Sequence, residues 1–109
     1  MSTETGSSTS NVGISFIGGN QTLTGNTTIV GSSVNAQGLS FQGGALNITA
    51  TAGRSVNLTG ITSNATNATI AGINISSALN LSSAGAAVLV SGTANAGSGV
   101  LVSSNLTNL

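Results

Sequence analysis

Short stretches in which apolar and polar residues alternate recur along most of the chain. The clearest share the pattern apolar, Asn, apolar, Ser or Thr, and lie at 46–49, 56–59, 73–76 and 79–82, with looser copies at 88–91 and 100–103. Alternation with a period of two places apolar side chains on one face of a strand and polar side chains on the other. The pattern therefore predicts a series of short, half-buried β-strands. Helix is disfavoured because glycine recurs every few residues, at a cost of about 1 kcal/mol each in a helix interior.

A longer echo connects two of the predicted strands. The segment ISFIGG at 14–19 returns 25 residues later as LSFQGG at 39–44. Self-similarity at a period of roughly 20–50 residues is typical of repeat architectures, in which each unit buries its apolar face against the next. The later copies of the strand pattern are unevenly spaced. We therefore predict an all-β fold, a β-solenoid resembling a parallel β-helix, with irregular rungs.

The first eleven residues differ from the rest. Residues 1–11 contain no apolar side chain after Met1, so the pattern gives them nothing to contribute to a core. We interpret 1–11 as a flexible or docking tail, and 12–109 as a single β-solenoid domain.

Charged residues are nearly absent. They make up 2% of the chain, Glu4 and Arg54 are the only two, and there is no His or Cys. Acid–base catalysis needs titratable groups, metal sites need Cys, His or several carboxylates, and nucleic-acid binding needs several Lys or Arg. We therefore predict a protein that is not an enzyme, holds no cofactor or metal and binds no nucleic acid. The longest apolar run, 84–90, is far shorter than the roughly 18 residues of a membrane-spanning helix, so no membrane span is expected.

The same composition favours self-association. The formal net charge is +0 and the mean hydropathy is +0.40, and a net charge near zero promotes association. The chain also lacks the Lys and Pro residues that usually protect exposed strand edges. These features predict a homopolymer that builds an extracellular filament, a pilus-like fibre or a coat. With so few charges, we expect such an assembly to depend only weakly on salt and pH.

Two sets of residues are candidates for the joint between subunits. The C-terminal segment is apolar and strand-like to its end, through Val100, Leu101, Val102, Leu106 and Leu109. It either adds to the open edge of the next subunit by β-augmentation or forms the last rung of its own fold. Glu4 and Arg54 are the second set: they either pair within or between subunits or remain solvated, and an exposed pair contributes only about 0–1 kcal/mol.

The chain also carries nine Asn-x-Ser/Thr sequons, four of them within the strand pattern. The four candidates for glycosylation are Asn20, Asn26, Asn64 and Asn67. The alternative interpretation is structural, because stacked asparagines in a solenoid hydrogen-bond to one another as an amide ladder.

Residues 31–92 contain the strings GSSVNAQGLSFQGGALNITATAGRSVNLTG and INISSALNLSSAG. They resemble the repeats of filamentous-haemagglutinin-type bacterial adhesins, which form a parallel β-helix. The resemblance implies a fibrous role, extracellular or at the cell surface, and no particular receptor. The chain departs from that pattern in being far shorter and in lacking the charged residues and secretion domain of such adhesins.

Two other functions compete with the self-assembling structural protein. The first is a monomeric adhesin or an ice- or glycan-binding solenoid, for which threonines such as Thr22 and Thr24 would form a flat face and surface glycans would be the partner. The second is a functional amyloid, in which strands stack between chains rather than within one chain.

Overall fold

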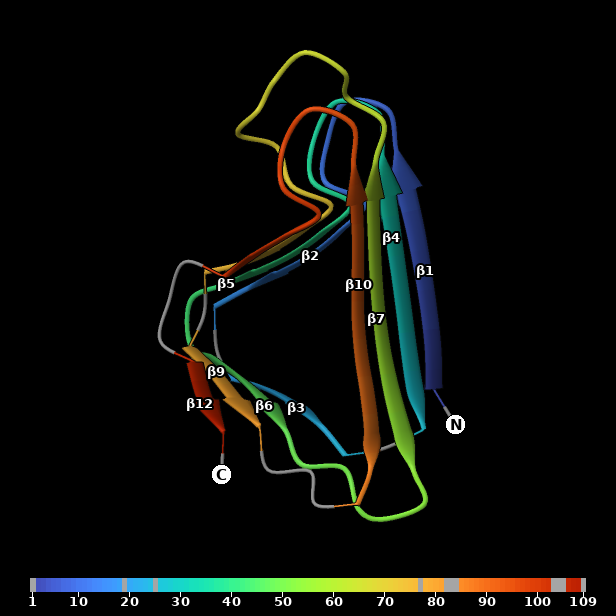
Figure 1. Cartoon of the computed structure of the whole chain (residues 1–109), viewed down its shortest axis with the longest axis vertical. Helices are drawn as coiled ribbons and strands as arrows, with labels where there is room; N and C mark the ends of the chain where they lie inside the picture. Colours follow the sequence, from blue (N-terminus) through green and yellow to red (C-terminus); the bar gives the residue numbers. More distant parts are fainter. Residues whose placement is uncertain are drawn as a thin grey trace.

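The computed structural model describes the whole chain except residues 1, 19, 25, 77, 82–84, 103–105 and 109. Every regular element in the described residues is a β-strand: twelve strands form three parallel sheets of four strands each. The chain visits the three sheets in turn and repeats this circuit, so that the sheets enclose a common interior (Figure 1). The predicted all-β solenoid is confirmed.

Each circuit, or rung, contributes one strand to each sheet. The long sheet contains β1 (Ser2–Ser8), β4 (Thr27–Ser33), β7 (Ser55–Thr62) and β10 (Ala87–Ala94). The second sheet contains β2 (Ile14–Ile17), β5 (Leu39–Gln42), β8 (Ile73–Ile75) and β11 (Val100–Val102). The third sheet contains β3 (Gln21–Leu23), β6 (Ala45–Ile48), β9 (Ala78–Leu81) and β12 (Leu106–Asn108). Rung 1 is thus β1–β3, and rung 4 is β10–β12.

The 25-residue echo in the sequence corresponds to one turn of the coil. β2 pairs with β5 in a register that places Phe16 opposite Phe41, and the two rings stack with centroids 4.9 Å apart. Later turns are longer because two connections are extended: 63–72 joins β7 to β8, and 49–54 joins β6 to β7. The rungs are therefore irregular in length while their strands stay in register.

The core lies in the two middle rungs. All the buried hydrophobic residues that the structure describes belong to rungs 2 and 3: Ile29, Leu39, Phe41, Leu46, Ile48, Ala50, Val56, Leu58, Ala71, Ile73, Ile75 and Leu79. The apolar residues of the outer rungs that pack against them, such as Phe16 and Val90, are only partly buried. A rung is buried here only when it has a neighbour on both sides, as expected for a solenoid.

Residues 1–11, interpreted from the sequence as a flexible or docking tail, contain a strand in the structure. Ser2–Ser8 form β1, which pairs with β4 along its whole length, from Ser2 opposite Thr27 to Ser8 opposite Ser33. An edge strand is held through the backbone groups of its neighbour and needs few apolar side chains of its own. A hydrophobic pattern therefore cannot reveal it.

A double column of glycines joins the long sheet to the second sheet. Gly6, Gly31, Gly60 and Gly92 lie opposite one another in the long sheet, and Gly13, Gly38, Gly72 and Gly99 directly precede the strands of the second sheet. The two backbones approach so closely that a Cβ on Gly31 would lie 2.1 Å from the carbonyl oxygen of Gly38. Only glycine fits such an approach. We call this double column the glycine seam.

Beyond the seam, an arch connects each strand of the long sheet to the second sheet. A hydroxyl at the last residue of the strand accepts a hydrogen bond from an N–H of the arch: Asn11 donates to Ser8, Ala36 to Ser33 and Asn64 to Thr62. In register with them, rung 4 carries Ala94. Ser33 also donates to the carbonyl of Asn11 at 2.7 Å, which ties the arch of rung 2 to that of rung 1.

Candidate assembly interface

The C-terminal end of the coil leaves core-facing side chains uncovered. Val100 and Val102 lie opposite Ile73 and Ile75 in the second sheet. The isoleucines are completely buried, whereas the valines are 38% and 37% exposed. The difference arises because β11 is the outermost strand of its sheet, so the next rung is missing above it.

The other C-terminal candidates differ in their placement. Leu101 lies opposite Asn74 on the other face of β11 and is 41% exposed. Leu106 belongs to β12, which pairs with β9, but its side chain is not among those described. Leu109 lies outside the described residues. The C-terminal segment thus forms the last rung of its own fold, and the outer edges of β10, β11 and β12 have no partner among the described strands.

The N-terminal end of the coil is hollow. A cavity of about 280 Å³ opens there, lined by Glu4, Phe16, Leu23 and Ile29 together with polar residues of rung 1 and of the start of rung 2. Phe16, Leu23 and Ile29 also pack in the core. The mouth of this cavity is therefore the uncovered end of the core, and it carries one carboxylate.

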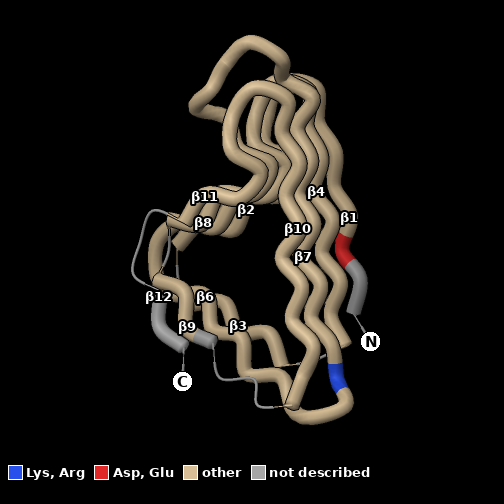
Figure 2. Tube along the Cα trace, viewed as in Figure 1, with Lys and Arg blue, Asp and Glu red and all other residues tan. Residues whose placement is uncertain are grey.

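Glu4 and Arg54 are not brought together. Glu4 lies in register with Ile29 and Leu58, so it is two strands away from β7, and Arg54 precedes β7 by one residue. With about 4.8 Å between strands and about 3.3 Å per residue, their Cα atoms are roughly 16 Å apart. Figure 2 shows the red segment on β1 and the blue segment at the turn that leads into β7. The backbone of Arg54 has a structural role, since its N–H donates to Thr51 and its carbonyl accepts from Ala87.

Two of the candidate glycosylation sites connect neighbouring rungs. The side-chain oxygen of Asn20 accepts from the N–H of Ala45 at 3.0 Å, and that of Asn26 accepts from the N–H of Ser55 at 3.3 Å. Asn26 has a positive φ of 46°, a conformation that asparagine tolerates better than most residues. These contacts give both side chains a structural role at the first residue of a strand in the next rung, β6 for Asn20 and β7 for Asn26.

The other two candidates lie in the extended connection 63–72. The oxygen of Asn64 accepts from the N–H groups of Thr66 and Asn67, and the oxygen of Asn67 accepts from the N–H and hydroxyl of Thr69. Such turns are typical of asparagine in loops. Asn67 and its sequon threonine Thr69 are both exposed, as Asn20 is, whereas Asn26 and Asn64 are only partly exposed.

The predicted amide ladder is present at one step. In the third sheet Asn47 lies opposite Asn80, and the amide of Asn80 donates to the oxygen of Asn47 at 2.8 Å. The same column continues with Thr22 below and Thr107 above. The column is therefore mixed, and it does not form a regular array of threonines.

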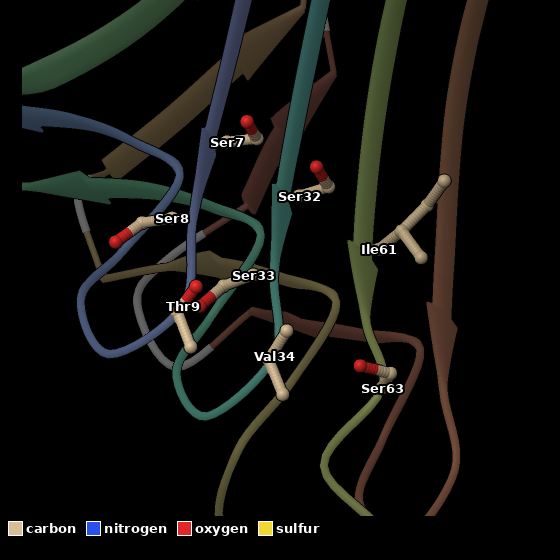
Figure 3. Close-up of a pocket in the computed structure, with 8 residues that line it drawn as sticks. All are labelled: Ser7, Ser8, Thr9, Ser32, Ser33, Val34, Ile61 and Ser63. Carbon is tan, nitrogen blue, oxygen red and sulfur yellow. The ribbon is translucent and has the colours of Figure 1, made fainter.

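A groove lined by hydroxyls follows the ends of the long sheet. Its volume is about 400 Å³, and its lining consists of Ser7, Ser8, Thr9, Ser32, Ser33, Val34, Ile61 and Ser63 (Figure 3). Ser7, Ser32 and Ile61 lie opposite one another on three neighbouring strands. The groove offers small hydroxyl donors and acceptors from three rungs. The strand pattern alone did not point to it.

The described residues contain no group of three or more His, Cys, Asp or Glu side chains that could hold a metal ion. No helix in the same part of the chain is long and apolar enough to cross a membrane. No known family, curated protein or solved structure was found to match this chain. The resemblance to filamentous-haemagglutinin-type repeats therefore stays a prediction.

Proposed function

We propose that the protein is a non-enzymatic structural subunit that stacks head to tail into a filament, fibre or coat outside the cell or at its surface. The observation that carries the proposal is the pair of open ends of the coil. One end exposes the core-facing Val100 and Val102, and the other opens onto Phe16 and Leu23. A second copy of the chain is the partner that these ends fit.

Rungs 1 and 4 match each other in the features that stacking requires. Both carry the glycine pair of the seam, Gly6 with Gly13 and Gly92 with Gly99, and both arches have the same length, 9–13 and 95–99. A rung 4 placed on the rung 1 of another copy would extend every sheet in parallel register. The operation is heterologous and does not close, so it produces a filament rather than a dimer.

The outer dimensions of the molecule set an upper bound on the area of the end face. The molecule measures 40 × 26 × 21 Å. Figure 1 is viewed down the shortest dimension, which runs approximately along the axis of the coil. The end is therefore bounded by about 1,000 Å², and stable complexes bury about 800 Å² per partner. Stacking would add backbone hydrogen bonds along three strands to this apolar contact.

The test compares two neighbouring residues on opposite faces of β11. Val100→Lys and Leu101→Lys change side chains that are 38% and 41% exposed in the single subunit, so their effects on folding are expected to be similar. In a stack only the lysine at 100 would point into the joint, where an unpaired buried charge costs about 3–5 kcal/mol. We expect Val100→Lys to raise the critical concentration for assembly by about 100-fold or more, and Leu101→Lys to have little effect.

Assembly is measured by sedimentation and negative-stain electron microscopy between about 50 mM and about 1 M salt, at pH values from about 3 to 7. Circular dichroism of both variants checks that they fold. A wild-type chain that stays dispersed under all these conditions at high concentration would contradict the proposal. So would equal assembly of the two lysine variants.

The hydroxyl groove favours a second candidate function, the binding of glycans by a single subunit. Ser7, Ser32 and Ser63 offer hydrogen-bonding groups along about 400 Å³ of groove, although the lining contains no aromatic ring on which a sugar would stack. Titration of oligosaccharides monitored by NMR tests this candidate: shifts confined to the groove residues, lost in Ser32→Val, would support it. A functional amyloid is less favoured because the strands already pair within one chain.

A further inference from the structure

The single carboxylate side chain of the protein lies in a core-facing column. Glu4 is in register with Ile29 in rung 2 and Leu58 in rung 3, both buried, and with the partly buried Val90 in rung 4. It lines the cavity at the N-terminal end of the coil together with Phe16. Glu4 is exposed in the single subunit because no rung covers β1.

No charged side chain borders this carboxylate. The strands that border Glu4, namely β2, β3 and β4, contain no titratable side chain. Arg54, the only cation among the side chains, is roughly 16 Å away and exposed. In a head-to-tail stack the covering strands would be β10 and β11 of the next copy, which also contain no titratable side chain.

In a stack, Glu4 would therefore be covered by Val90 of the next copy, which occupies the same column. An ionised carboxylate loses its hydration there and gains no partner, whereas the protonated form is far less costly to bury. Inward-pointing charges at strand edges are a known means of preventing edge-to-edge association.

We propose that Glu4 is a proton-controlled gate on assembly: the subunits stack when Glu4 is protonated and separate when it is ionised. This inference rests on the proposed head-to-tail stacking and adds its regulation. It also revises the expectation, drawn from composition, that assembly depends only weakly on pH. Dependence on salt remains weak, but dependence on pH is strong because the one carboxylate is at the joint.

The direction and size of the pH effect follow from proton linkage. An ordinary glutamate is ionised at pH 7 and mostly protonated at about pH 3. At a pH where the carboxylate of the free subunit is ionised, each joint that forms must take up one proton. The critical concentration for assembly therefore rises by about tenfold per pH unit. The fold itself lacks other acidic side chains, so it is expected to persist across the same range.

The experiment measures the critical concentration from about pH 3 to pH 7 for the wild type and two variants. Glu4→Gln removes the charge at the exposed position. The double variant Glu4→Gln with Thr5→Glu keeps the net charge but moves the carboxylate to the next residue, which lies in register with Val30 and Thr59 on the other face of the sheet. Both variants keep the C-terminal carboxylate, so a pH dependence that they lose is caused by Glu4 and not by the end of the chain.

We expect the critical concentration of the wild type to rise by about tenfold per pH unit above about pH 5. The critical concentrations of both variants are expected to stay the same across the range. If wild type and Glu4→Gln assemble with the same pH profile, the gate is wrong while stacking stands. If neither assembles at any pH, stacking itself is wrong and the gate fails with it.

Discussion

The two middle rungs and the two outer rungs each contribute one strand to every sheet, and these strands pair in one continuous register, yet the rungs differ in burial. Val56 in rung 3 is completely buried, while Val88, directly opposite it in rung 4, is only partly buried. Rung 3 has strands on both sides, and rung 4 has strands on one side. Burial in this fold is therefore set by the number of neighbouring rungs rather than by the residue type.

The outer rungs also depart from the middle rungs in their side chains. Glu4 occupies a column that is otherwise apolar, and Ala94 stands where the other rungs have Ser or Thr. Neither departure closes the end with a capping element in the described residues. The ends of the coil are therefore open in the described residues, and substitutions in matched positions test how far middle and outer rungs differ.

The largest difference is expected at the glycine seam. Alanine at Gly60 would place its Cβ 2.2 Å from the carbonyl oxygen of Gly72, and the middle rung cannot move away. We expect Gly60→Ala to cost about 4 kcal/mol or more of unfolding free energy. Gly6→Ala, in the same column, is expected to cost about half as much because rung 1 can shift outward.

Gly53→Ala is the matched control for backbone strain. Gly53 has a φ of 81°, but no atom lies within 4 Å of the position that a Cβ would occupy there. Its substitution is expected to cost about 1–2 kcal/mol from the left-handed conformation alone. Urea unfolding followed by circular dichroism measures all three, and equal costs for Gly60→Ala and Gly53→Ala would exclude a tight seam.

A smaller difference is expected between two valines of one column. Val56→Ala removes buried methyl groups and is expected to cost about 2–3 kcal/mol, whereas Val88→Ala is expected to cost about 1 kcal/mol. The same urea titration measures both. If the subunits stack, the cost of Val88→Ala rises toward that of Val56→Ala in the assembled protein, because its column is then covered. Equal costs in the dispersed subunit would argue against open ends.

The smallest effects are expected at the arches. Ser33→Ala removes a hydroxyl that bonds both Ala36 and Asn11, at an expected cost of about 1–2 kcal/mol. Ala94→Ser supplies the missing hydroxyl to rung 4 and is expected to stabilise the protein by about 0.5–1 kcal/mol. Thermal unfolding resolves both shifts. Destabilisation by Ala94→Ser would show that the arch of rung 4 differs from the others.

The sequence predicts much of this fold from two signals. Period-two alternation identifies most of the strands of rungs 2 to 4, and the echo around Phe16 and Phe41 identifies the length of the first turn. Both signals depend on apolar side chains. β1 is polar and is held through its backbone, so the alternation does not reveal it.

The site was less predictable than the fold. The candidates Val100 and Val102 are core-facing and uncovered, but Leu101 lies on the other face, a distinction that depends on register. The role proposed for Glu4 can be inferred only once the register shows which residues share its column. The glycine seam has a sequence signal, a spacing of seven residues at Gly6 and Gly13 that recurs in rungs 2 and 4, which an apolar pattern does not include.

The most direct test of head-to-tail stacking is the axial rise of the assembled protein, measured by electron cryomicroscopy at about pH 3. Four rungs at about 4.8 Å each predict a rise of about 19 Å per subunit, with strands continuous across every joint. A filament with this rise and with rung 4 of one copy on rung 1 of the next would support the stacking. A rise unrelated to four rungs, or subunits joined through their sides, would contradict it.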